Sequence, residues 1–169
     1  VPADVRMESY VRGKTVDAIK DANVKVNRAL RAGAMSVGAE VEIFDHPGYM
    51  PYTRNDELEK VLIGACTEYV GAAELKHRGH STGSTDMGDY SCIMPTTSIG
   101  MGGCEGPGHS RDFKITDSIR QYIVPAKALA ITVVDLLIND ASAAKKVIDG
   151  FVPTIKRDDY SDFMKKLVE

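Results

Sequence analysis

The stretch from His80 to Phe113 carries most of the residues in this chain that could do chemistry. It combines glycines, hydroxyl side chains, acids and one late histidine, His109, with little of the amphipathic periodicity of packed elements. A polar, glycine-rich segment of this kind usually wraps around a ligand instead of packing as core. We therefore treat it as the candidate functional segment.

His109 is the candidate metal ligand. It follows Gly102-Gly103 and Gly106-Pro107-Gly108, where the backbone can approach an ion closely, and a neutral imidazole is a good ligand. An exposed loop histidine that binds nothing is the alternative from residue type alone. The four histidines form neither an HExxH nor an HxH cluster, whereas a zinc hydrolase needs about three protein ligands and a general base. The sequence therefore offers one ligand and not a complete site.

The run Gly83-Ser84-Thr85-Asp86 has two compatible interpretations. Its hydroxyls and backbone N–H groups could form a concave anion site for a carboxylate or an oxyanion. Alternatively, one of its polar side chains caps a short helix that extends to Met94. A nucleotide site is excluded, because Gly100-Met101-Gly102-Gly103 is neither GxGxxG nor a P-loop with its lysine.

Composition limits the class of protein. The 169 residues suffice for one ordinary domain or two small pieces, and a net charge of −3 gives no electrostatic case for nucleic acid or an anionic membrane. Three cysteines without CxxC spacing favour a reducing compartment. No apolar run reaches the roughly 18 residues that span a bilayer, and no signal-peptide pattern is present. We expect a cytoplasmic protein.

The hydrophobic pattern predicts an α/β fold. Residues 4–11 and 41–43 alternate as strands do, and a helical face runs between them over 14–36. A turn-rich linker at 45–56 precedes a helix over 57–70, with Asn55 or Asp56 as its cap. We then expect a short strand at 96–101, an apolar helix over 124–139 buried against a sheet, and terminal helices over 141–150 and 160–168.

Four features, in order, resemble the C-terminal part of metallopeptidases of the aminoacylase/carboxypeptidase G family. They are Pro2-Ala3 followed by Arg12 ten residues after the proline, the segment 51–56, the run 83–86, and Gly108-His109-Ser110-Arg111-Asp112-Phe113. Within that family, Gly83-Ser84-Thr85-Asp86-Met87-Gly88-Asp89-Tyr90-Ser91 followed by Met94-Pro95-Thr96 is most similar to the p-aminobenzoyl-glutamate hydrolase B-subunit group.

The resemblance implies a two-domain, zinc-peptidase-like fold. Residues 1–50 would be the C-terminal half of the lid, which is also the dimerisation domain, and residues 51–169 the C-terminal part of the catalytic domain. Arg12 would bind the substrate carboxylate, since a guanidinium matches it bidentately. The run 83–86 would line the substrate pocket, and His109 would be the last metal ligand.

The implied activity is cleavage of an amide bond in an N-acyl amino acid or a p-aminobenzoyl-glutamate-like substrate. Members of the family use two divalent ions (Zn or Mn). Their other metal ligands and their catalytic glutamate lie upstream of the lid in the sequence. We therefore expect that this chain belongs to a larger homodimeric protein, holds no metal pair alone, contains no catalytic residue and is inactive by itself. A non-catalytic binding or dimerisation module derived from the family is the alternative. We also expect His109 and the run 83–86 on one side of the domain.

Overall fold

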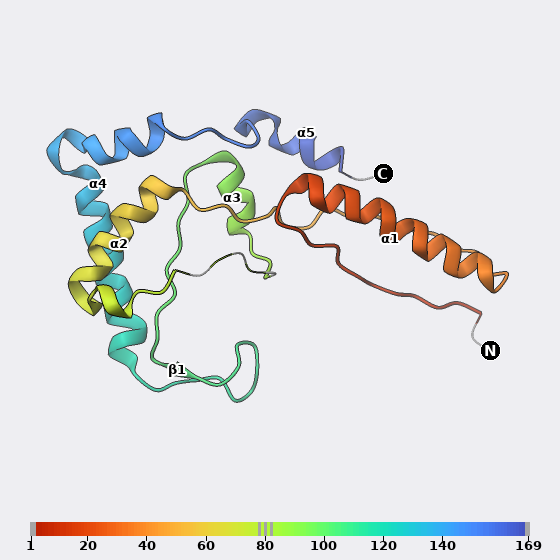
Figure 1. The fold of residues 1–169 in the computed structure, drawn as a ribbon, viewed down its shortest axis with the longest axis horizontal. Helices are drawn as coiled ribbons and strands as arrows, with labels where there is room; N and C mark the ends of the chain where they lie inside the picture. The colour runs from red at the N-terminus through yellow and green to blue at the C-terminus, as the bar shows by residue number, and fades with distance from the viewer. Residues whose placement is uncertain (1–2, 78, 80, 82, 168–169) are drawn as a thin grey trace. The chain divides into compact units, whose positions relative to one another are not determined.

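The computed structural model describes residues 3–77, 79, 81 and 83–167 of the chain. The chain is mostly helical (Figure 1). Its elements in order are α1 (Val16–Ser36), α2 (Asp56–Val70), η1 (Ala72–Glu74), α3 (Met87–Ile93), β1 (Cys104–Glu105), β2 (Lys114–Ile115), η2 (Ile119–Ile123), α4 (Val124–Asp149), η3 (Arg157–Asp159) and α5 (Tyr160–Lys165).

The chain divides into two compact units. Unit 1 consists of residues 1–52, 80–89 and 155–169, and unit 2 consists of residues 53–79 and 90–154. The boundary between the second segments of the two units falls inside α3.

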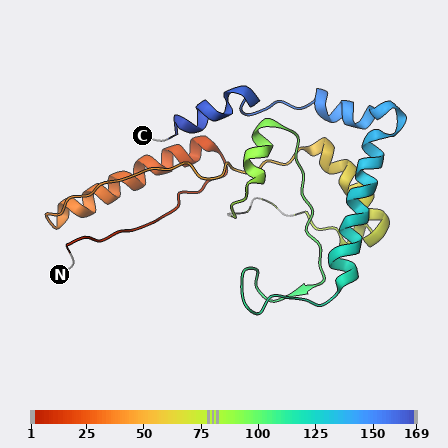
Figure 2. The same ribbon diagram turned by 180° about the vertical axis from the view of Figure 1, so that it is seen from behind.

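Unit 1 is built around α1, which begins where the Thr15 side chain accepts a hydrogen bond from the Ala18 N–H (3.2 Å). The segment that follows α1 returns along the helix (Figure 2). Asp45 fastens it there, because its Oδ2 accepts hydrogen bonds from the side-chain amides of Asn23 (2.8 Å) and Asn27 (2.7 Å), one turn apart. None of the residues of α1, all of which the structure describes, is buried.

Unit 2 is built around α2 and α4, which lie side by side (Figure 1). Asn55 caps α2 by accepting from the Leu58 N–H (2.9 Å). Leu62 and Cys66 from α2 and Ala128 from α4 form a buried cluster. Partly buried side chains of Leu75, Ile99 and Met101 pack against it.

The long helix α4 contains a sharp turn. Ile138 is extended (φ −65°, ψ 166°), and the three residues after it, Asn139, Asp140 and Ala141, have φ of 52°, 57° and 54°. Left-handed backbone is common for Asn and Asp but strained for alanine. The turn therefore separates the apolar first part of α4 from a short final part.

The predicted α/β class is wrong: the structure is 54% helix and 2% strand. Among the described residues, the strands are β1 and β2, which form one antiparallel pair. The segments 4–11, 41–43 and 96–101 are irregular chain instead of the expected strands. Alternating apolar and polar residues suit the two faces of a sheet. A strand also needs a neighbouring strand for its backbone hydrogen bonds, and the alternation does not supply one. The apolar helix correspondingly packs on α2 and not on a sheet.

Candidate functional site

Arg12 lies in unit 1, just before α1. Its side chain is exposed, and the guanidinium carbon is 5.5 Å from the centroid of the Tyr10 ring. Gly13 follows, and a Cβ there would lie 3.1 Å from the Ile19 side chain, so the chain runs close to the first turn of α1. The arginine is therefore held near the start of α1, with its side chain at the surface.

The run Gly83-Ser84-Thr85-Asp86 also lies in unit 1, as an irregular loop directly before α3. Gly83, Ser84 and Asp86 are exposed, and Thr85 is half-buried. The Thr85 hydroxyl donates to Asp86 Oδ1 (3.1 Å) and accepts from the Met87 N–H (3.4 Å). The short helix expected after this run is thus present, with Thr85 at its start. At the other end of the run, the Gly83 N–H donates a hydrogen bond to the Ser81 hydroxyl (3.1 Å).

The residues that support this loop come from the first turn of α3. The N–H groups of Gly88 and Asp89 donate to the backbone carbonyls of Thr85 and Asp86 (3.0 Å each). Gly88 is buried, and a Cβ at that position would overlap the Met50 carbonyl oxygen. The glycine therefore permits a close approach between α3 and the segment at Met50.

Asp89 joins three parts of unit 1. Its Oδ1 accepts hydrogen bonds from the Met50 N–H (3.1 Å) and from the Tyr160 hydroxyl (2.9 Å). Sequence reasoning missed both Asp89 and Tyr160 as supports of the loop. A glycine inside a short helix was the available signal for a close approach at 88, but no local pattern links position 89 to position 160.

His109 lies in unit 2, in the loop between β1 and β2. In that antiparallel pair, Cys104 is opposite Ile115 and Glu105 is opposite Lys114. The base of the hairpin is fixed at Gly103 (φ 98°), whose carbonyl accepts from the N–H groups of Thr116 (2.9 Å) and Asp117 (3.1 Å). A Cβ at Gly103 would lie 2.6 Å from the Asp117 carbonyl oxygen.

The turn that carries His109 is held by Ser110. The Ser110 N–H and hydroxyl both donate to the Pro107 carbonyl (3.3 and 2.9 Å), and the Ser110 Oγ accepts from the Asp112 N–H (3.2 Å). His109 is the third residue of the turn and has φ 62°, a conformation that favours glycine or asparagine. Its imidazole is exposed and makes no hydrogen bond or ion pair within the described part of the chain.

The structure therefore places Arg12 and the run 83–86 in unit 1 and His109 in unit 2. The expectation that His109 and the loop lie on one side of a single domain stays a prediction. Among the described residues, no group of three or more His, Cys, Asp or Glu side chains could hold a metal ion. His109 fits the role of one exposed imidazole ligand, and the described residues do not complete a site around it.

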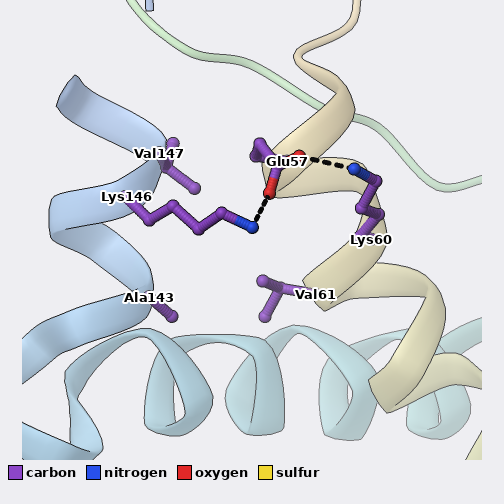
Figure 3. Close-up of a pocket in the computed structure, with 6 residues that line it drawn as sticks. All are labelled: Glu57, Lys60, Val61, Ala143, Lys146 and Val147. Carbon is purple, nitrogen blue, oxygen red and sulfur yellow. Dashed lines mark hydrogen bonds and ion pairs between the residues drawn. The ribbon is translucent and has the colours of Figure 1, made fainter. Parts of the chain in front are cut away.

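A shallow pocket elsewhere in unit 2 contains none of these candidates. In it, the Glu57 carboxylate accepts hydrogen bonds from Lys60 on its own helix and from Lys146 near the end of α4 (2.5 Å each) (Figure 3). Val61, Ala143 and Val147 line the same pocket. The hydrogen bonds from Lys146 and, to a smaller extent, from Lys60 lower the pKa of Glu57 from 4.5 to about 2. The carboxylate is already paired with two cations, so the arrangement fastens α4 to α2.

The most deeply buried cysteine, Cys66, is not a candidate nucleophile. All three are free thiols, and burial raises the pKa of the Cys66 thiol. A thiol is reactive as its thiolate, so burial keeps Cys66 inert.

One stretch bears on localisation. Residues Ile119–Asp149 are long and apolar enough by composition to cross a membrane. The core helix of a soluble protein meets the same criterion but is mostly buried, whereas 11% of the apolar window of this stretch is buried in the described structure. The cytoplasmic location stays a prediction.

Comparison with known proteins gave no match: no family model, no curated protein and no solved structure corresponds to this chain.

Proposed function

We propose that this chain is part of a metal-dependent amidohydrolase that cleaves an N-acyl amino acid or a p-aminobenzoyl-glutamate-like substrate. The chain would contribute Arg12, the run Gly83-Ser84-Thr85-Asp86 and His109. The resemblance of these motifs, in their order along the chain, motivates the proposal.

The observation that carries the proposal is the backbone of His109. The turn requires a left-handed residue at that position, and glycine stands at 106 and 108 on the same loop. Histidine costs about 1 kcal/mol more than glycine in this conformation. Strained backbone of this kind clusters at functional sites, and here it presents an exposed imidazole whose two nitrogens are available. A ligand role accounts for histidine where glycine would be more stable.

The residues would act in three ways. The Arg12 guanidinium would bind the substrate carboxylate through paired hydrogen bonds. The run 83–86 would bind a second polar group of the substrate through its hydroxyls and backbone N–H groups. His109 would occupy one ligand position of a divalent ion, and bound ions of this kind polarise an amide carbonyl and supply hydroxide near neutral pH.

The test is hydrolysis of p-aminobenzoyl-glutamate, in the presence of Zn²⁺ or Mn²⁺, by the protein that contains this chain. H109N keeps a residue that tolerates the left-handed backbone but removes the imidazole, and we expect kcat/KM to fall by on the order of 100-fold or more. The matched control is H46N, at an exposed histidine in another turn, which should leave the rate unchanged.

Three results would contradict the proposal in different ways. An H109N protein as active as wild type would exclude His109 as a ligand. Hydrolysis by the 169-residue chain alone would show that it holds a complete site. Tight binding of the substrate without metal and without hydrolysis would favour the alternative, a non-catalytic binding module.

A further inference from the structure

The loop at 83–86 is oriented by the helix that follows it. Thr85 and Asp86 accept backbone hydrogen bonds from Gly88 and Asp89, so the end of the loop and the first turn of α3 form one hydrogen-bonded piece. Whatever fixes this turn of α3 therefore also fixes the direction in which the loop presents its hydroxyls and N–H groups.

Asp89 fixes that turn, because its carboxylate reaches two other segments of unit 1. One contact is to the backbone of Met50, a residue that is 7% exposed, and the other is to the hydroxyl of Tyr160, the first residue of α5. Both contacts are partly buried, where hydrogen bonds to a charged acceptor are stronger than in open water.

The position of Tyr160 depends on the helix α5, which begins with this residue. Phe163, on the same helix, lies under the Lys20 ammonium of α1, with 5.5 Å between the nitrogen and the ring centroid. The helix α5 thus contacts α1, the element that follows Arg12, and α3, the element that follows the loop. The short helix α5 therefore touches both helices that follow the candidate substrate residues of unit 1.

We infer that Asp89 and Tyr160 are positioning residues for the substrate loop 83–86, an assignment that rests on the proposed function. Asp89 acts through the first turn of α3, and Tyr160 acts through Asp89. Loss of the Tyr160 hydroxyl leaves the loop with the same chemical groups but a wider range of orientations, so substrate binds more weakly while the chemical step is little changed.

The first measurement is hydrogen exchange of the Met87, Gly88 and Asp89 amides in this chain. Y160F removes only the hydroxyl and should speed exchange about tenfold, which corresponds to loss of one hydrogen bond to a charged group. D89N keeps an acceptor oxygen and should fall between wild type and D89A. Y122F, at a tyrosine that is 56% exposed, is the matched control and should change nothing.

The second measurement is the KM for p-aminobenzoyl-glutamate, or its Kd by calorimetry if no hydrolysis occurs. For Y160F we expect an increase of about tenfold with kcat within twofold of wild type. If D89A does not fold, Y160F and D89N still test the assignment.

The outcomes separate the two proposals. Unchanged exchange in Y160F overturns the positioning role, whatever the activity. Faster exchange with unchanged KM in an active enzyme also overturns it, while the amidohydrolase proposal stands. Binding without hydrolysis by the whole protein that contains this chain, with Kd raised in Y160F, supports the positioning role and overturns the amidohydrolase. A wild-type protein that neither binds nor cleaves the substrate overturns both.

Discussion

At the scale of single residues, the available space and the backbone conformation restrict which side chains fit at positions 88 and 109. Gly88 meets the Met50 carbonyl oxygen inside a helix, where alanine would normally be preferred to glycine. His109 occupies a left-handed position that glycine would suit better. At position 88 the packing leaves no room for a side chain. At position 109 a side chain is present although glycine would make the protein more stable.

G88A should lower the free energy of unfolding by about 3 kcal/mol, because the new methyl group overlaps a carbonyl oxygen that cannot move without the backbone of 50–51. The matched control is G64A in α2, where nothing lies within 4 Å of the added Cβ. G64A should raise the same free energy by about 1 kcal/mol through helix propensity. Urea unfolding measures both, and equal effects of the two changes would show that α3 does not approach Met50 in solution.

The candidate site residues could be proposed from the sequence because residue type alone suggests them, and their roles stay predictions. Arg12, Ser84 and His109 are polar side chains that lie exposed outside the regular helices. Their support was not predictable. Asp89 and Tyr160 are 71 positions apart, and only the fold brings a carboxylate and a hydroxyl within 2.9 Å. The same limit applies to Asp45 and its two asparagines.

At the scale of elements, helices were predictable and strands were not. The helices predicted over 14–36 and 57–70 are observed as Val16–Ser36 and Asp56–Val70, and the terminal helix as Tyr160–Lys165. A helix satisfies its backbone within one segment, so its periodicity is sufficient information. A strand depends on a partner that the local pattern does not contain, and the alternating segments 4–11 and 41–43 are unpaired here.

Alanine-to-glycine changes inside and just after the left-handed turn of α4 should have opposite effects on stability. A141G should stabilise the protein by about 1 kcal/mol, because glycine adopts a φ of 54° without the strain that alanine bears. A144G, three residues later in helical backbone, should destabilise it by about 1 kcal/mol. Thermal unfolding of the two variants measures the difference. Destabilisation by both would mean that α4 runs straight through residue 141.

The ion pairs of Glu57 give α2 and α4 a pH-dependent contact. Its pKa is about 2 in the folded chain and 4.5 ordinarily, so the unfolded state binds more protons between these values and stability rises with pH there. The contribution is complete above about pH 4.5 and is lost as the pH falls to about 2. E57Q should therefore flatten the dependence of the free energy of unfolding on pH in this window.

Urea unfolding at a series of pH values from 2 to 6 tests this prediction, with added salt weakening the effect in wild type. The matched control is E68Q on the same helix, at an exposed glutamate that makes no ion pair among the described residues. A pH profile of E57Q that coincides with that of wild type and E68Q would show that the Lys146 contact is absent in solution.

At the scale of the whole chain, the two units differ in how much they bury. Unit 2 contains the buried residues Leu62, Ala65, Cys66, Cys92, Ala128 and Val147. The buried hydrophobic residues in the described part of unit 1 are Met50 and Ile155. Side chains of unit 1 such as Val5 (78% exposed), Tyr10 (79%) and Phe44 (75%) face water. Burial of apolar surface is the main stabilising contribution to folding, so unit 2 should be the more stable of the two.

Hydrogen exchange across the chain should reveal this difference. Amides in α2 should exchange more slowly than those in α1 by on the order of 100-fold or more, because α1 has little tertiary contact and isolated helices are marginal in water. Equal protection would mean that a second surface covers α1. Sedimentation equilibrium would then show whether that surface belongs to a second copy, as expected from the resemblance to family members that dimerise through the lid.

The link between Asp45 and α1 has a consequence for the chemical ageing of the protein. One carboxylate oxygen is shared by the side-chain amides of Asn23 and Asn27. Deamidation of either asparagine would replace a donor with a second negative charge at the same short distance, and attraction would become repulsion. A chemical change of one mass unit would therefore release the segment that returns along α1. In aged protein, unit 1 would become less stable although every peptide bond is intact.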